Sequence, residues 1–229
     1  MDRGLYIAAS GMLAEQIRQD QIANDLANAS TPGYKADRTS QRSFNDLLLA
    51  NSATGQTVGP QSTAVQVDRI VTDFSGRPLR ETGEPLDFGI SGDGFFAVQT
   101  GQGVRYTRNG QFALDTQGRL VTASGDPVLG PNNQPITAGA DGTVNPRAIG
   151  VFNLTNPAKQ GDSLVSGTAA GAATGTVQSG MLESSGADPA RSMVDMISSM
   201  RAFEAGQKVI QTIDETLGKA ATQVGSTGS

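Results

Sequence analysis

Apolar residues recur at a spacing of seven near the C-terminal end of the chain. This spacing keeps one stripe of a helix facing a partner helix, because two turns of a slightly underwound helix return to the same side. Asp188 can cap the first free N–H groups, and Pro189 suits the first helical position, where its missing N–H costs nothing. The pattern therefore predicts a helix over residues 188–224 that packs along a second helix. Its stripe comprises Met196, Phe203, Ile210, Leu217 and Val224.

Two further methionines, Met193 and Met200, are predicted to lie on this stripe, whereas Gln207 and Asp214 interrupt it farther along. The stripe is therefore narrower in its second half and forms no strong two-stranded zipper by itself. A helix of this length, roughly 50 Å at about 1.5 Å per residue, exceeds the radius of a globule of 229 residues. We expect it to protrude or to pack against an equally long partner.

A second amphipathic helix is predicted at the N-terminus, over residues 2–28. The apolar run 5–14 resembles the core of a secretory signal, but Asp2 offsets Arg3 and polar helix follows, so we expect no cleaved signal peptide. Small side chains bury little area, so this helix is marginal alone in water. A chain with a marginal helix at each end is incomplete as a monomer. The N-terminal stripe comprises Leu5, Ala9, Met12, Gln16, Ala23 and Leu26.

The N-terminal helix is predicted to end at residues 30–33, because proline disfavours helix before it and Gly33 accepts a positive φ. Asn24 and Asn28 stand four residues apart just before this end. If buried, such a polar pair would need hydrogen-bond partners and would fix the register between chains. The alternative is a solvated helix end followed by an ordinary turn, and the spacing alone does not decide between them.

The middle of the chain changes to short strands with frequent turns. Asn109-Gly110 and Asp141-Gly142 are typical of the turns that join antiparallel strands. Residues 79–180 are therefore predicted to form a small antiparallel β domain, a sandwich or an open barrel, with a flexible loop at 163–175. Residues 36–78 are polar and predict an extended arm, whose one apolar island, 44–49, predicts a short docking helix.

The predicted fold class is thus α+β, with terminal helices that pair as a coiled coil and a central all-β antiparallel domain. The expected parts are residues 1–35 (N-terminal helix), 36–78 (arm), 79–180 (β domain) and 181–229 (C-terminal helix). Two marginal helices that need a partner, joined by a β domain, are typical of a self-assembling subunit. Heterologous contacts that do not close would build such subunits into a tube.

Composition limits the other classes of function. The net charge of -5 and the isoelectric point near 4.7 argue against a nucleic-acid partner or an anionic membrane surface. No apolar stretch approaches the roughly 20 residues that span a bilayer. Cysteine and histidine are both absent, which excludes disulfides, histidine-based triads and metal sites with Cys or His ligands.

Candidate catalytic motifs are also better explained as turns. Gly92-Asp93-Gly94 precedes no helix and lacks the lysine of a phosphate loop. Four aspartates, Asp87, Asp93, Asp115 and Asp141, could pair as glycosidase carboxylates or bind calcium, but each sits beside glycine or in a predicted turn. We expect no enzyme, no cofactor and no metal. A secreted carbohydrate-binding β protein stays as the alternative, although aromatic residues are only 5% and tryptophan is absent.

Four blocks of the chain carry a family resemblance. Residues 22–35 closely resemble the N-terminal signature of flagellar basal-body rod and hook proteins, departing from it at Asp25. Residues 196–204, which include Arg201-Ala202-Phe203-Glu204, resemble the C-terminal block, although residues 185–187 depart from its usual opening. Residues 85–96 and 106–112 are similar to the central β blocks of the same family. The resemblance covers nearly the whole chain.

The resemblance implies a structural subunit of the flagellar rod, in which the terminal helices form an inner coiled-coil layer and the β domain an outer layer. It implies contacts with copies of itself and with other rod proteins, and with hook or ring components, in the rod that crosses the periplasm. It also implies export by the flagellar type III apparatus, with Phe44 and Leu48 as export-signal candidates. Features at residues 1–3, 27–33, 208–210 and 214–215 favour the proximal-rod type. The element at 44–48 and the block Asp73-Phe74-Ser75 are also similar to the distal-rod type.

The residues expected at subunit interfaces lie on the two terminal helices. On the N-terminal helix they are Leu5, Met12, Ile22, Asn24, Leu26 and Asn28. On the C-terminal helix they are Met193, Met196, Met200, Phe203, Ile210 and Leu217.

Overall fold

The computed structural model describes residues 2–44, 47–50, 57–61 and 64–226. Internal contacts divide the chain into two compact units. The helical unit comprises Met1–Leu26, Asp37–Val71 and Pro189–Ser229, and the β unit comprises Ala27–Ala36 and Thr72–Asp188. The architecture is α+β with helices at the chain ends and antiparallel strands between them, as predicted. No helix in the described part of the chain is long and apolar enough to cross a membrane.

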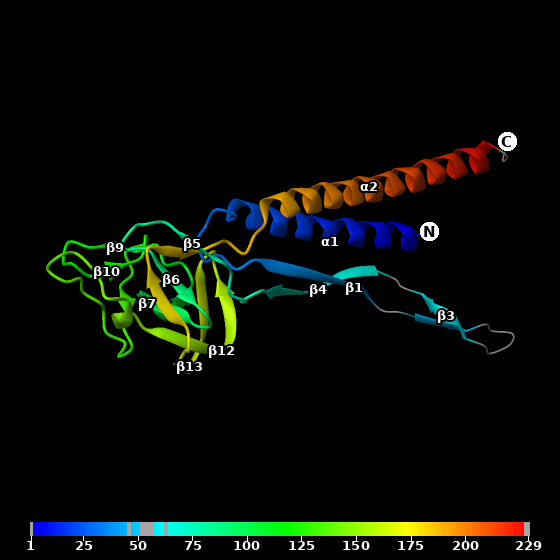
Figure 1. Ribbon diagram of the computed structural model, residues 1–229. Helices are drawn as coiled ribbons and strands as arrows, with labels where there is room; N and C mark the ends of the chain where they lie inside the picture. Colours follow the sequence, from blue (N-terminus) through cyan, green and yellow to red (C-terminus); the bar gives the residue numbers. More distant parts are fainter. Residues whose placement is uncertain (1, 45–46, 51–56, 62–63, 227–229) are drawn as a thin grey trace. The chain divides into compact units, whose positions relative to one another are not determined.

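The helical unit contains helix α1 (Asp2–Ala27) and helix α2 (Pro189–Ser226), drawn side by side in Figure 1. Helix α2 begins at Pro189, as predicted. Two narrow ribbons complete the unit: β1 (Asp37–Phe44) pairs with β4 (Ala64–Thr72), and β2 (Leu47–Ala50) pairs antiparallel with β3 (Thr57–Gln61).

The prediction of a short helix over residues 44–49 was wrong. Phe44 ends β1 and Leu48 lies in β2, while residues 45 and 46 lie outside the described part of the chain. A run of so few apolar residues fits a strand as well as a helix, and pairing with β3 decides in favour of the strand.

The β unit is built around a sheet that closes on itself. Strand β7 (Phe95–Thr100) pairs with both β12 (Val151–Gln160) and β8 (Gly103–Thr107), while β13 (Leu164–Ala172) pairs with β12 and β8. These four strands therefore form a small closed barrel, and β11 (Val128–Leu129) extends it along β7. All these pairings are antiparallel, as expected from the turn-rich sequence.

Shorter elements surround this barrel. Strand β6 (Phe88–Ser91) pairs with β14 (Thr176–Ser179), β5 (Leu79–Glu81) with β15 (Met181–Glu183), and β9 (Ala113–Leu114) with β10 (Leu120–Val121). A 3-10 turn, η1 (Pro146–Ala148), precedes β12. The prediction of a flexible loop at residues 163–175 was wrong, because most of this segment forms β13.

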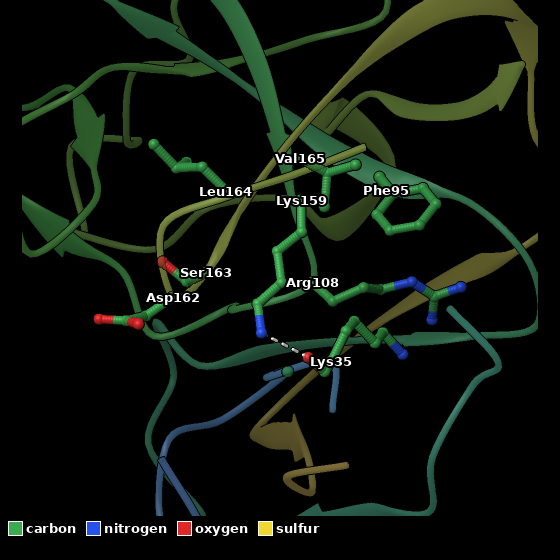
Figure 2. Close-up of a pocket in the computed structure, with 9 residues that line it drawn as sticks. Lys35, Phe95, Arg108, Lys159, Asp162, Ser163, Leu164 and Val165 are labelled. Carbon is green, nitrogen blue, oxygen red and sulfur yellow. Dashed lines mark hydrogen bonds between the residues drawn. The ribbon is translucent and has the colours of Figure 1, made fainter. Parts of the chain in front are cut away.

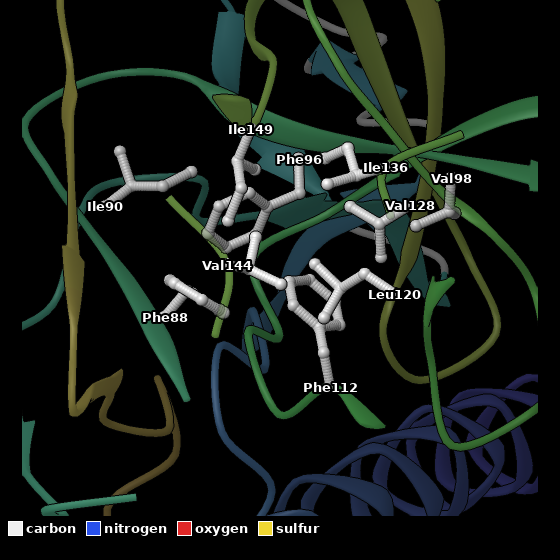
Figure 3. Close-up of a cluster of buried hydrophobic side chains, with 10 residues drawn as sticks. All are labelled: Phe88, Ile90, Phe96, Val98, Phe112, Leu120, Val128, Ile136, Val144 and Ile149. Atoms are coloured by element: carbon white, nitrogen blue, oxygen red, sulfur yellow. The ribbon is translucent and has the colours of Figure 1, made fainter. Parts of the chain in front are cut away.

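The core of the β unit is apolar and aromatic. Phe96 is fully buried, and its ring meets the Phe112 ring edge-on with 5.3 Å between centroids. Figure 3 shows these two rings among the aliphatic side chains that surround them, which include Val128 and Leu120. A second cluster is formed around Ala97 and Leu129, which alternate along β7 and β11 with residues of the first cluster. Edge-on aromatic pairs add stability beyond the area they bury.

Candidate assembly surfaces and the junction of the chain ends

Helices α1 and α2 run antiparallel along a seam of small and apolar residues. The Oγ atom of Ser199 donates a hydrogen bond of 2.6 Å to the Glu15 carboxylate. Farther from the β unit in sequence, a Cβ atom added to Gly206 would lie 2.7 Å from Cγ of Met12. One added to Gly4 would lie 3.3 Å from Cδ1 of Ile213. As the residue number increases along α2 from 199 to 213, the number of the contacted residue in α1 decreases from 15 to 4. The two helices are therefore antiparallel.

Helix α2 places two rows toward this seam. The row that the sequence predicted is at least partly buried at each described position: Met196, Phe203, Ile210 and Leu217. A second row alternates with it at spacings of three and four, which is the pattern of a helix packed against another. It consists of Ser192, Ser199, Gly206 and Ile213, all buried or half-buried.

Met193 and Met200 do not share this seam, contrary to expectation. Their side chains are 54% and 53% exposed. The reason is that the seam has its second row on the other side of Phe203, where Ser199 and Gly206 let the two backbones approach closely. Small residues at a helix contact bury less apolar area, but they allow the two helix backbones to come closer together.

The predicted residues of α1 divide between buried and exposed positions. Ile22 is buried, and Leu5, Met12 and Leu26 are half-buried. Asn24 is exposed. Beyond the end of α1, the Asn28 side chain accepts a hydrogen bond of 3.1 Å from Oγ1 of Thr31 and so stabilises the turn after the helix.

Each helix also carries an apolar row turned away from the seam. On α1 the outer row is Tyr6, Leu13 and Ile17, with Tyr6 62% and Leu13 60% exposed. On α2 the outer row is Met193, Ile197 and Met200, which are all more than half exposed. Both rows follow helical spacings of three, four or seven, so each forms a continuous stripe. The α1 outer row was not predicted, because the sequence pattern of α1 was interpreted as a single apolar stripe.

A pair of glycine substitutions in α2 tests the seam. Gly218→Ala is expected to stabilise α2 by about 1 kcal/mol, since no atom lies within 4 Å of the added methyl group. Gly206→Ala is expected to lose that gain, because the methyl group meets Met12. Thermal melting of the helical far-UV circular dichroism signal compares the two. Equal stabilisation by both substitutions would contradict the close contact between α1 and α2.

A buried group of charges lies inside the β unit, where the segment after α1 meets the segment before α2. The Glu183 carboxylate accepts a 2.6 Å hydrogen bond from Nζ of Lys35 and a 2.9 Å hydrogen bond from Nη1 of Arg108. The side chains of Lys35, Arg108 and Glu183 are at most 3% exposed. We call these three residues the junction cluster. Buried charges of this kind persist only when paired and hydrogen-bonded.

Backbone atoms complete the environment of the junction cluster. Nζ of Lys35 also donates to the Ser75 carbonyl oxygen at 2.6 Å, and Nη2 of Arg108 donates to the Gly92 carbonyl oxygen at 2.9 Å. The backbone N–H of Arg77 donates to the Glu183 carboxylate at 3.0 Å. Burial lowers the pKa of the Lys35 ammonium group, and the neighbouring Glu183 carboxylate opposes that shift.

The two chain segments are also joined directly. The N–H of Gly33 donates to the Glu183 carbonyl oxygen at 2.9 Å, and the N–H of Gly186 donates to the Tyr34 carbonyl oxygen at 2.8 Å. Oγ of Ser185 donates to the Asn28 carbonyl oxygen at 2.8 Å. The segment that follows α1 and the segment that precedes α2 are therefore neighbours within the β unit.

Tyr34 and a small pocket border the junction cluster. Tyr34 is completely buried, and Nζ of Lys159 lies 4.0 Å from the centre of its ring, a cation–π contact. Figure 2 shows Lys159 pointing to the Lys35 carbonyl oxygen, and the Arg108 side chain running beside that of Lys35. The pocket between these residues has room for about one water molecule. It is too small for an organic substrate or cofactor.

No group of three or more Asp and Glu residues in the described part of the chain is placed to hold a metal ion. Two of the aspartates considered as catalytic candidates, Asp115 and Asp141, stabilise turns through their carboxylates. The Asp115 carboxylate accepts hydrogen bonds from the N–H groups of Gln117 and Arg119, and these lower its pKa. The Asp141 carboxylate accepts from Thr143 in the same way.

Comparison with known proteins agrees with this architecture. Three family descriptions match successive parts of the chain: "Flagella basal body rod protein" at residues 5–35, "Flagellar hook protein FlgE/F/G D1 domain" at 89–153, and "Flagellar basal body rod FlgEFG protein C-terminal" at 178–223. The first and last descriptions cover much of α1 and α2, and the second covers the middle of the β unit, from β6 to the start of β12.

Individual relatives match over nearly their full lengths. The flagellar basal-body rod protein FlgG of Bacillus subtilis is 34% identical, over 95% of this chain and 97% of its own. The flagellar hook-basal body complex protein FlhO of the same organism is 32% identical, over 98% and 99%. The flagellar basal-body rod protein FlgF of Caulobacter vibrioides is also 32% identical, over 98% and 99%. This chain therefore belongs to the family of flagellar basal-body rod proteins.

Proposed function

We propose that this protein is a structural subunit of the flagellar rod and that its terminal helices join it to its neighbours. The observation that carries the proposal is the pair of outer rows on α1 and α2. An apolar stripe along an exposed helix face marks an interaction surface. In this proposal α1 and α2 of one subunit pair as a coiled coil along their seam, and the outer rows pack against other subunits.

The two outer rows suggest how such contacts would propagate. The α1 row contains Tyr6, Leu13 and Ile17, whereas the α2 row contains Met193, Ile197 and Met200. Because these surfaces differ, packing the α1 row of one copy on the α2 row of the next is a heterologous contact. A series of such contacts leaves one unpaired row at each of its two ends, and repetition builds a ring or a helical tube.

Location and partners follow from the same proposal. The relatives are named as flagellar rod and hook-basal body proteins, so we place this protein in the basal-body rod, in contact with other rod or hook components. We further propose export by the flagellar type III apparatus, with Phe44 and Leu48 as candidate recognition residues. We assign the protein no catalytic role, no cofactor and no membrane-inserted segment.

The relatives include both FlgF and FlgG proteins at similar identity. We propose the proximal rod, the position of the FlgF type, because the sequence features at residues 1–3 and 208–210 favour it. The distal, FlgG-type position is the second candidate.

The proposal is tested in cells that lack the gene. Basal bodies purified from them are expected to end within the rod, and electron microscopy measures where. If the distal rod assembles normally without this protein, the proximal position is wrong. If complete flagella form, the protein is no essential rod subunit.

Single charges on the helices then test the surfaces. Leu13→Asp in the outer row of α1 and Phe203→Asp in the seam are expected to leave export intact and to prevent incorporation, since a buried unpaired carboxylate is costly. Gln16→Asp and Ser198→Asp are matched controls, because both residues are exposed positions of the same helices and lie in neither row. Quantitative immunoblotting of purified basal bodies measures incorporation. Equal incorporation of Leu13→Asp and Gln16→Asp would contradict a role for the outer row.

A further inference from the structure

The segment that follows α1 belongs to the β unit and contains a buried cation, Lys35. Lys35 lies deep in the β unit with only 3% of its side chain exposed. An apolar side chain at this position would dock without any requirement for a charged partner. A buried ammonium group instead needs a negative charge within hydrogen-bond distance, since an unpaired buried charge is strongly unfavourable.

The only carboxylate hydrogen-bonded to Lys35 among the described residues comes from the far end of the chain. Glu183 lies in β15, shortly before α2 begins, and its carboxylate also pairs with Arg108. Without Glu183, Lys35 would keep only the Ser75 carbonyl oxygen, and Arg108 only the Gly92 carbonyl oxygen. The cluster would then hold two buried cations and no anion.

The charges are also unbalanced when the cluster is complete. Two cations, Lys35 and Arg108, share one carboxylate, and Nε of Arg108 has no hydrogen-bond partner among the described residues. The adjoining pocket has room for about one water molecule. An incompletely neutralised cluster beside water contributes little net stability, but it penalises docking strongly when one partner is absent.

We propose that the junction cluster is an ionic latch that makes docking of residues 33–35 conditional on residues 183–186. The latch closes only when β15 has paired with β5, because that pairing brings Glu183 into place. Closing it also forms the Gly33 to Glu183 and Gly186 to Tyr34 hydrogen bonds, which join the segment after the end of α1 to the segment before the start of α2. Given the function proposed above, only a chain whose C-terminal segment has folded then presents α1 and α2 together.

Amide hydrogen exchange on the purified full chain tests the latch. In Glu183→Gln, exchange at Gly33 and Gly186 is expected to accelerate at least about 100-fold, the effect of leaving a buried charge unpaired. The amide of Leu120, which donates to Ile136 in the core, reports on the rest of the β unit. Its exchange is expected to accelerate much less than that of Gly33.

A second background separates a latch from a general packing defect. Lys35→Met removes the cation and keeps a side chain of similar length. In this background the further change Glu183→Gln is expected to accelerate Gly33 exchange less than about 10-fold, because fewer buried charges lose their partner. Equal acceleration in both backgrounds, or acceleration at Leu120 as large as that at Gly33, would overturn the proposal. These measurements need no assembled flagellum, so their outcome is independent of the incorporation assay.

Discussion

Replacing Gly33 by alanine is expected to release the segment 33–35 from the β unit. The added Cβ atom would lie 2.3 Å from both the carbonyl carbon and the oxygen of Arg108, and 2.5 Å from the Asn109 nitrogen. These are backbone atoms next to a buried ion pair, so they cannot move aside cheaply. In addition, φ of Gly33 is +66°, where a residue with a Cβ atom is strained by about 1–2 kcal/mol.

Gly83→Ala is the matched control for this substitution. Gly83 has a similar φ of +76°, but nothing lies within 4 Å of an added Cβ atom. It should show the backbone strain alone, about 1–2 kcal/mol, whereas Gly33→Ala should cost clearly more and expose Tyr34. Limited proteolysis between residues 28 and 36, with urea unfolding, measures both effects. If the two variants behave alike, Gly33 does not pack tightly against Arg108.

Phe96→Ala is expected to reduce the free energy of unfolding of the β unit by about 3–5 kcal/mol, the usual cost of deleting a buried aromatic ring. Phe96 is fully buried, and its ring contacts Phe112 edge-on. Because small domains are stable by only about 5–15 kcal/mol, this loss removes a large part of the total.

Phe96→Leu serves as the comparison, since it keeps most of the apolar volume and should cost less than the alanine variant. Urea denaturation followed by circular dichroism measures both. A loss below about 1 kcal/mol for Phe96→Ala would mean that the core around Phe112 can collapse into the space. The observed packing of Phe96 would then contribute little.

The helices were predictable because their signal is local. The spacing of Phe203, Ile210 and Leu217 is visible in the sequence, and Asp188-Pro189 marks where the helix starts. The second row of the seam was not recognised, because Ser199 and Gly206 are not apolar. Their importance comes from how closely α1 approaches, which depends on residues such as Met12 that are far away in the sequence.

Strand β13 and the junction cluster show the other limit. The Gly, Ala, Ser and Thr residues of β13 are typical of a loop, and the strand forms because β12 and β8 pair with its two edges. Lys35 stood inside a recognised signature, but its partner Glu183 is 148 residues away. No local pattern connects two such residues. The one available signal was the charge of Lys35, which directly follows Gly33 and Tyr34 at the end of that signature.

The bond between Ser185 and Asn28 has an evolutionary consequence. The chain first enters the β unit at Ala27 and finally leaves it at Asp188, and this bond holds the two places close together, while residues 37–71 belong to the helical unit. Insertions are tolerated best where both ends of the inserted piece are close in space. The β unit thus behaves as a domain inserted in the chain between α1 and α2. Its loops can lengthen, shorten or be exchanged in descendants of this gene while the helices that follow its two ends keep their attachment.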